Sequence, residues 1–159
     1  MSVKHVLTAL AAAVVMVSCG KKQEPQVQTE PVKEEKAGPT TNRLPEYHFT
    51  DTVRVGQRTY AYTLHREASD SLGSVRDEFG DYYVNNFYTL NIKRDGSQFY
   101  SKRFTKQTLA GRLSSDFMKN GILDGFRFNR VDNGKLVFSL CVSYPDSDLS
   151  APFLLTIGP

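Results

Sequence analysis

The segment NFYTLNIKRDGSQFYSKRFT, residues 86–105, decides the fold of this chain. Apolar side chains recur at every second position of its first half, as in a strand with one buried face: Tyr88, Leu90 and Ile92. Asp95-Gly96 follows, and a two-residue hairpin turn favours such residues because both central positions take a positive φ. The second half returns with apolar side chains again in one phase, at Tyr100 and Phe104. The segment therefore predicts an antiparallel β-hairpin of two strands, Asn86–Arg94 and Ser97–Thr105.

The same pattern recurs on both sides of this hairpin. Thr52–His65 alternates in two phases that change at Gly56-Gln57, which indicates a bulge or two strands. The polar stretch Arg66–Asp81 predicts a long loop. Downstream, alternation and turn residues predict three further strands: Gly125–Val131, Lys135–Tyr144 and Pro152–Ile157. The middle one is apolar in both phases, which predicts a central strand covered on both faces with Cys141 buried in it.

Between the first hairpin and these strands, the spacing predicts one short helix. Thr105 is a suitable N-cap, and apolar side chains follow on one stripe at Leu109, Leu113 and Phe117. Asn120-Gly121 predicts a left-handed end to the helix. The expected fold class is therefore mainly β: an antiparallel sheet or sandwich built from hairpins, with one short helix packed on it. Because Gly158 follows the final strand so closely, that strand either lacks a partner, as in a truncated chain, or pairs inward.

The amino terminus carries the most specific signal in the chain. A positive start is followed by a twelve-residue apolar run, Val6–Val17, and then by Ser18-Cys19. This run is too short to span a membrane and is typical of a secretory signal peptide. A cysteine at this place resembles the lipobox of bacterial lipoproteins, which implies cleavage after residue 18 and a lipid on Cys19. The alternatives are an ordinary signal peptide and a buried helical segment with a chance cysteine.

The remaining chain divides into a tether and one domain. Gly20–Arg43 contains three prolines, many charged and amide side chains and no aromatic residue, so it buries too little apolar surface to fold. We expect residues 1–18 to be the signal peptide, 19–43 the lipidated cysteine with a disordered tether, and 44–159 a single β-rich domain. A lipid on Cys19 would place the protein in the cell envelope, and Gly20 is compatible with the outer membrane, facing the periplasm. The formal net charge of only +3, with acids and bases mixed, argues against a nucleic-acid partner.

Three stretches of the domain resemble a family of small, uncharacterised Bacteroidetes lipoproteins, known as a domain of unknown function. They are NNFYTLNIKRDG (residues 85–96), FTKQTL (residues 104–109) and LVFSLCVSYPDSD (residues 136–148). These motifs consist of strand and turn residues. The resemblance therefore implies a β-rich fold and a lipid anchor, but no reaction.

The residue types that carry catalysis or bind metals are not arranged in a recognisable motif. His48 and His65 lie in no metal-ligand spacing and beside no cysteine pair, so the sequence predicts no metal site and no cofactor. Cys141 could pair with a histidine as a nucleophile, but its place in a strand favours a buried packing role. Asp146 and Asp148 lie in a turn, where aspartates bind backbone amides; a weak calcium site is the alternative.

An aromatic cluster, residues 79–88, is the best remaining candidate for a binding surface. Tyrosines there offer flat apolar faces with a polar tip, and two asparagines beside them offer amides. The candidate contact residues are Tyr82, Tyr83, Asn85 and Asn86, with core packing as the alternative role. We therefore expect a lipid-anchored, non-enzymatic binding or assembly module for an envelope protein or glycan. The alternative is an envelope hydrolase whose site the sequence does not reveal.

Replacing the expected lipid-bearing residue tests the anchor. Metabolic labelling with a fatty acid should tag the wild-type protein, and Cys19→Ala should abolish the tag and release the protein from the membrane fraction. The reason is that acyl burial contributes roughly 0.8 kcal/mol per methylene group, so several chains hold a protein firmly. Cys141→Ala, which removes the other cysteine, is the control and should remain labelled. Acyl chains on the Cys19→Ala variant would rule out this anchor.

Overall fold

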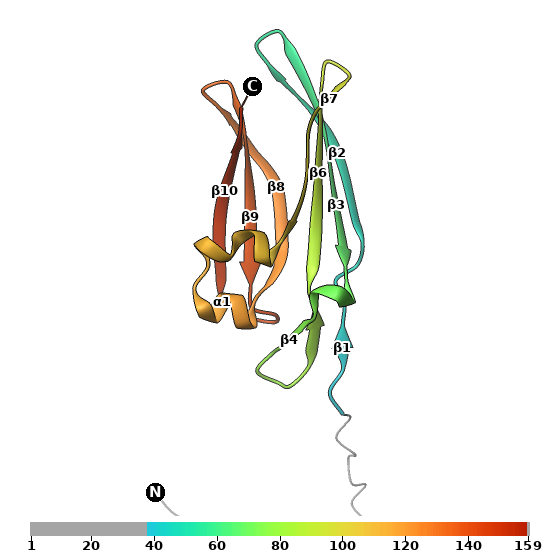
Figure 1. Cartoon of the computed structure of the whole chain (residues 1–159), viewed down its shortest axis with the longest axis vertical. Coiled ribbons are helices and arrows are strands. Elements are labelled where there is room, and N and C mark those ends of the chain that lie inside the picture. Colours follow the sequence, from blue (N-terminus) through green and yellow to red (C-terminus); the bar gives the residue numbers. More distant parts are fainter. Residues whose placement is uncertain (1–37, 159) are drawn as a thin grey trace, which may run out of the picture. The chain divides into compact units, whose positions relative to one another are not determined.

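A computed structural model describes residues 38–158, and two large β-sheets pack face to face in it (Figure 1). The main sheet has the order β2-β3-β6-β7 and contains β2 (Tyr47–Val55), β3 (Arg58–Ala68), β6 (Asn86–Arg94) and β7 (Ser97–Thr105). The facing sheet has the order β10-β9-β8 and contains β8 (Ile122–Asp132), β9 (Lys135–Ser143) and β10 (Ser150–Ile157). All neighbours in both sheets are antiparallel. The expected fold class is confirmed.

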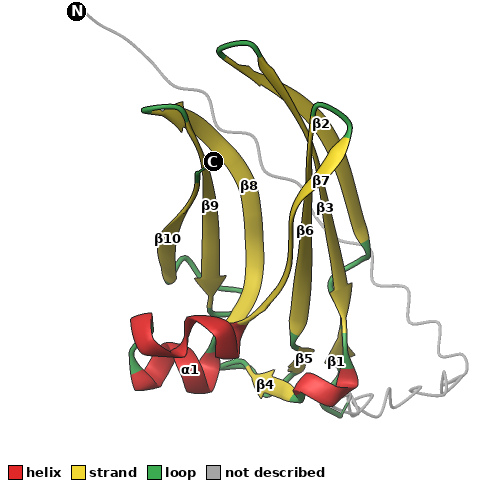
Figure 2. Ribbon diagram, turned by 45° about the horizontal axis from the view of Figure 1, so that its top comes forward, coloured by secondary structure: helices red, strands yellow, loops and turns green. Residues whose placement is uncertain are grey.

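A small third sheet and three short helices complete the described part of the chain. The small sheet has the order β1-β5-β4 and contains β1 (Thr41–Asn42), β5 (Tyr82–Val84) and β4 (Ser74–Arg76). The helices are η1 (Asp70–Leu72), η2 (Lys106–Arg112) and α1 (Ser115–Asn120). In Figure 2 the small sheet, α1 and the loop between β9 and β10 lie at one end of the sandwich, and the turns between β2 and β3, β6 and β7, and β8 and β9 lie at the other. No helix within residues 38–158 has the length and apolar character needed to cross a membrane. The expected signal peptide and Cys19 lie outside the described residues.

The predicted hairpin over residues 86–105 forms with the expected bounds, as β6 and β7. Asp95 and Gly96 both adopt positive φ, 50° and 86°, as a two-residue turn requires. Asp95 also binds the neighbouring hairpin, because its carboxylate accepts hydrogen bonds from Thr59 N (2.9 Å) and Arg58 Nη1 (2.8 Å). The β6–β7 turn is therefore fastened to β3.

The stretch around Gly56-Gln57 is a second hairpin, so the two-strand interpretation is confirmed. Gly56 has φ of 59°, and β2 pairs with β3 from Val55↔Arg58 outward. The prediction of a long loop over residues 66–81 is wrong in part. β3 continues to Ala68, and Ser74–Arg76 forms β4. A three-residue strand with one buried side chain, Val75, is too short to show alternation in the sequence.

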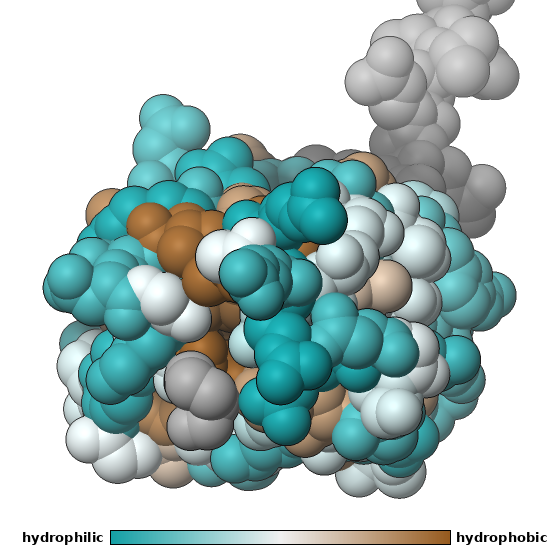
Figure 3. All heavy atoms as spheres, turned by 90° about the horizontal axis from the view of Figure 1, so that it is seen from above, coloured by the Kyte–Doolittle hydropathy of each residue, from teal (hydrophilic) through white to brown (hydrophobic). Residues whose placement is uncertain are grey.

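Aromatic side chains join the two large sheets. Tyr62 of β3 meets Phe138 of β9 edge-on, with ring centroids 5.4 Å apart. Phe126 of β8 lies edge-on to Phe138 and to Phe104 of β7, at 5.9 and 5.2 Å. Aliphatic side chains that are at most 2% exposed surround these rings: Leu64, Leu90, Ile92, Leu123, Leu136, Leu140 and Val142. Figure 3, seen from the end with the two-residue turns, shows a band of apolar side chains flanked by polar ones.

The crossover between the sheets differs from the single helix expected after Thr105. Thr105 does cap η2, in a capping box with Thr108, but the chain becomes extended at Leu113 (φ −101°, ψ 143°). Ser114 then caps α1, and Gly121 has φ of −93° rather than a left-handed conformation. Gly111, inside η2, weakens that helix, and the cap at Ser114 stabilises a separate helix, α1. The chain therefore forms two short helices instead of one.

Gly121 and Arg112 fit the crossover to the facing sheet. A Cβ on Gly121 would lie 2.7 Å from a methyl group of Val142, so glycine permits a close approach of the chain to β9. The Arg112 side chain donates a hydrogen bond to the Leu154 carbonyl of β10 (3.3 Å) and covers the Phe153 ring at 4.9 Å. The crossover therefore covers the β10 side of the sandwich.

β9 is the central strand of the facing sheet, as expected, but only its inner face is covered throughout. Cys141 points outward and is half-buried, with its sulfur 3.5 Å from Ser143 Oγ. The expectation that Cys141 is buried between two layers is therefore wrong, because no further layer packs on this face within the described residues. β10 pairs inward with β9 along its whole length, from Ser150↔Ser143 to Ile157↔Leu136.

Lys106 is a buried amine whose titration should make the stability of the domain depend on pH. Its side chain is 4% exposed and donates to the Gly121 carbonyl at 2.6 Å, and burial lowers its pKa from 10.5 to about 8. Between these values the unfolded chain binds a proton that the folded chain has lost, so stability rises with pH. From pH 8 to 10.5 we expect wild type to gain on the order of 2–3 kcal/mol relative to Lys106→Met.

Urea unfolding of the two proteins at several pH values measures this gain. Lys119→Met, at an exposed position of α1, is the matched control, and its difference from wild type should stay constant across the window. Parallel stability curves for wild type and Lys106→Met would contradict the prediction.

Candidate functional site

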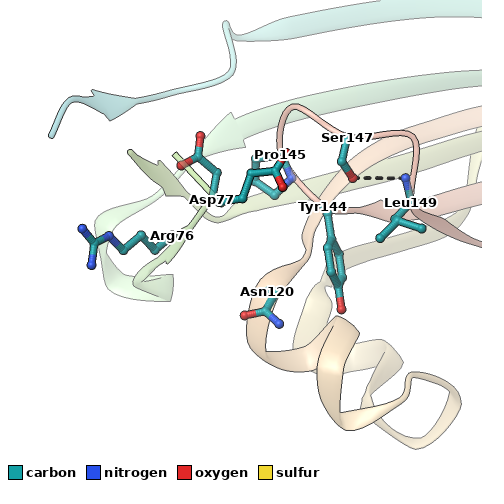
Figure 4. Close-up of a pocket in the computed structure, with 8 residues that line it drawn as sticks. Arg76, Asp77, Asn120, Tyr144, Pro145, Ser147 and Leu149 are labelled. Carbon is teal, nitrogen blue, oxygen red and sulfur yellow. Dashed lines mark hydrogen bonds between the residues drawn. The ribbon is translucent and has the colours of Figure 1, made fainter. Parts of the chain in front are cut away.

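A pocket of about 370 Å³ lies between the small sheet, α1 and the loop that joins β9 to β10 (Figure 4). Most of its surface is apolar. The residues that line it are Arg76, Asp77, Glu78, Asn120, Tyr144, Pro145, Ser147 and Leu149. The sequence brings them from three separate segments, so no local motif marks the pocket.

The β9–β10 loop supplies the apolar wall. Its turn closes through a hydrogen bond from Tyr144 N to Leu149 O at 2.9 Å, and Leu149 N donates to Ser147 Oγ at 3.1 Å. Asp146 adopts a positive φ of 51° within this turn. The Tyr144 ring packs against Phe117 of α1, with centroids 4.9 Å apart. These contacts hold Tyr144 and Leu149 on one wall of the pocket.

The opposite wall is the turn that follows β4. One carboxylate oxygen of Asp77 accepts hydrogen bonds from three backbone amides, those of Phe79, Gly80 and Asp81, at 2.7–3.0 Å. Arg76 Nε donates to Gly80 O at 3.0 Å, and its guanidinium lies over the Tyr82 ring at 5.7 Å. Asp77 and Arg76 therefore serve mainly to shape this wall, whereas Glu78 is exposed beside the pocket.

The chemistry of the pocket is that of a binding site for an apolar group. The Tyr144 ring, Pro145 and Leu149 provide an apolar surface, and the Asn120 amide and Tyr144 hydroxyl provide hydrogen-bonding groups on the α1 side (Figure 4). Small-molecule and side-chain pockets commonly combine apolar walls with a few polar groups in this way. The pocket lining contains no histidine, lysine or cysteine.

Two of the four residues predicted as contacts lie close to this pocket. Tyr82 is 39% exposed, beneath the Arg76 side chain that lines the pocket. Tyr83 donates its hydroxyl hydrogen bond to the Asp146 carboxylate, and this bond raises the pKa of Tyr83 to about 12. Tyr83 therefore links the small sheet to the loop carrying Tyr144, and Asp146 is engaged in that link.

The other two predicted contacts, Asn85 and Asn86, lie in the interior. They are 4% and 1% exposed. The Asn85 amide donates to the carbonyls of Leu72 and Gly73 at 3.1 and 3.2 Å, and the Asn86 amide donates to Leu123 O at 3.3 Å. The structure thus assigns both amides to the packing of the domain rather than to its surface. Composition alone does not separate these asparagines from the exposed Tyr82 and the half-buried Tyr83, because all four lie in one short segment.

Cys141 does not meet either histidine. It lies on the outer side of the facing sheet, whereas His48 and His65 belong to the main sheet. A thiol–imidazole nucleophile is therefore not assembled from these residues.

The pairing of β2 with β3 produces a cluster that sequence spacing missed. His48 and His65 are direct cross-strand partners, and Glu46 joins them, so that one potential ligand atom from each lies within 4.8 Å of the others. Motif spacing along a single strand does not reveal such a pair. The sequence feature that could have revealed this pair is the Gly56-Gln57 turn, because the position of the turn determines which residues of β2 and β3 face each other.

Comparison with known proteins gives a family but no activity. A family model with the description "Domain of unknown function (DUF4738)" matches residues 26–159, which is most of the chain. No curated protein matches the sequence. Because this match covers residues 26–159, the chain belongs to the DUF4738 family.

Proposed function

We propose that this protein is a lipid-anchored binding module of the cell envelope, which recognises a partner protein through the end pocket and catalyses no reaction. The observation that carries the proposal is the apolar surface of Tyr144, Pro145 and Leu149 beside the Asn120 amide. Such a surface suits an apolar side chain of a partner better than a sugar, which would need more polar contacts.

The position of the pocket supports a role near the anchor. β1 pairs with β5 at this end of the domain, and Thr40 N donates to Asp81 Oδ1 at 2.7 Å, so the chain enters the domain beside the pocket wall. With a lipid on Cys19, the segment up to Thr40 would span at most about 75 Å when fully extended. A partner bound in the pocket would therefore lie in the same layer of the envelope.

The pocket lining favours binding over hydrolysis. Its serine, Ser147, accepts a hydrogen bond from Leu149 N and has no histidine or lysine beside it in the lining to take its proton. Arg76 and Glu78 place opposite charges at the rim, where they favour one orientation of a docking partner.

Site-specific photo-crosslinking in the cells that produce the protein tests this proposal. A photoreactive phenylalanine analogue is introduced in place of Leu149, which is 58% exposed at the pocket, or of Leu154, which is 47% exposed on β10. We expect irradiation to give one discrete adduct at Leu149 and none at Leu154, because only the first position lines the pocket. Adding Asn120→Ala and Tyr144→Ala should weaken the Leu149 adduct severalfold.

Two results would overturn the proposed role. One is equal adduct formation at the two positions; the other is a Leu149 adduct that is unaffected by the pocket substitutions. Circular dichroism of the purified variants checks that each one folds, so that a lost adduct reports on the pocket.

A further inference from the structure

Three side chains with metal-binding atoms converge on the outer face of the main sheet. His48 of β2 and His65 of β3 face each other across the antiparallel pair, and Glu46, two residues before His48, lies on the same side. Nε2 of His48 and Nε2 of His65 lie 2.9 and 2.8 Å from the same carboxylate oxygen of Glu46. The two imidazole rings are stacked, with centroids 4.0 Å apart and an angle of 11° between their planes. Two nitrogens and one oxygen thus point toward one place.

The backbone around this cluster is held in position by Arg66. Its Nη2 and Nε donate to the Pro45 carbonyl at 2.9 and 3.3 Å, and its Nη1 donates to Asp124 O at 3.2 Å. The residue before Glu46 is therefore fastened to β3 and to the facing sheet. The histidines are set by the strand pairing itself, since His48↔His65 lies inside a continuous run of paired residues. A site on two paired strands is more precise than one on a loop.

The surroundings leave the outward side of the cluster accessible. The side chains of Glu46 and His48 are 61% and 63% exposed, whereas that of His65 is 24% exposed. On the next strand, Phe87 presents its ring edge-on to His65, at 6.5 Å, and the Arg103 guanidinium covers Phe87 at 4.0 Å. Phe87 thus lies between Arg103 and the His65 ring, and the exposure of Glu46 and His48 shows that solvent reaches the cluster.

We propose that Glu46, His48 and His65 form a binding site for a divalent transition-metal ion of the Zn²⁺ class, with water completing the coordination. Two imidazole nitrogens and one carboxylate oxygen select this class over Ca²⁺ and Mg²⁺, which prefer all-oxygen sites. Each histidine would bind through Nε2 and carry its proton on Nδ1. Tetrahedral Zn²⁺ with bonds of about 2.0–2.1 Å needs donors roughly 3.3 Å apart. The present separations of 2.8 and 2.9 Å would lengthen by about 0.5 Å on binding. The two stacked rings would also tilt against each other, so that both nitrogen lone pairs meet at the ion.

Titration of the full-length protein with ZnCl₂, followed by calorimetry and by the NMR signals of the histidine rings, tests the site. We expect one equivalent to bind and to shift the ring signals of His48 and His65 together. MgCl₂ should leave both signals unchanged. Bound metal should also raise the unfolding temperature, because it binds only the folded chain.

Variants of the cluster separate this site from other donors in the chain. Loss of a residue that only orients a metal ligand typically weakens binding about 10–100-fold, so His48→Ala, His65→Ala and Glu46→Gln, which each remove a ligand, should weaken it by at least about tenfold. Thr50→Ala, on β2 and next to the cluster on the same face, should bind as wild type does. Cys141→Ala should also bind as wild type does, because its thiol lies on the other sheet.

The proposal fails if a full equivalent of Zn²⁺ leaves either histidine signal in place. It also fails if His65→Ala keeps the wild-type affinity. All three ligand residues lie on the surface of the sheet, and the amide spectrum of each variant checks that it is folded. The ring signals of the wild-type protein decide the question even if a variant does not fold.

Discussion

The described domain depends on the hydrogen bonds of one half-buried arginine, Arg66. Its guanidinium binds the carbonyls of Pro45 and Asp124 and lies 3.4 Å from the Tyr88 hydroxyl. Tyr88 in turn donates to Asp124 O at 2.7 Å. One charged group thereby joins the segment before β2, the main sheet and the first strand of the facing sheet. Hydrogen bonds to a charged group contribute about 1.5–3 kcal/mol each, so loss of Arg66 would loosen both sheets at once.

Local turn chemistry made much of this fold predictable. Asp95-Gly96 and Asn133-Gly134 both adopt the positive φ values that two-residue turns require, and apolar residues recur at every second position in the strands beside them. The capping role of Thr105 was also predictable from the sequence, because a cap depends on the three residues that follow it. The end of the helix that begins there was harder to predict. Its interruption at Leu113 depends on a competing cap and on the close approach of Gly121 to β9, and the second of these is a tertiary contact.

The candidate sites were harder to predict, because each of them joins segments that are distant in sequence. Tyr83 was identified from its aromatic segment, but its bond to Asp146 needs the small sheet to lie beside the β9–β10 loop. His48 and His65 are seventeen positions apart, and only a two-residue turn at Gly56-Gln57 makes them partners. If Gly56-Gln57 is taken as a two-residue turn, His48 and His65 follow as partners, because paired residues lie at equal distances from the turn. The burial of Asn85, by contrast, could not be predicted, because the residues around it in the sequence do not distinguish an interior amide from an exposed one.

The contact of Arg112 with Leu154 also affects how much of the sheet edge is open to pairing with another chain. β10 is the outermost strand of its sheet, and the carbonyl that Arg112 occupies would otherwise be open to another chain. Pro152, two residues earlier and facing the same way, has no amide hydrogen to offer. At the other sheet's margins, Asp51 accepts from Thr52 N at 2.7 Å, and Gln98 donates to Tyr100 O at 2.7 Å. These contacts occupy some of the backbone groups at the sheet edges, so fewer of them are free to pair with a strand of another copy.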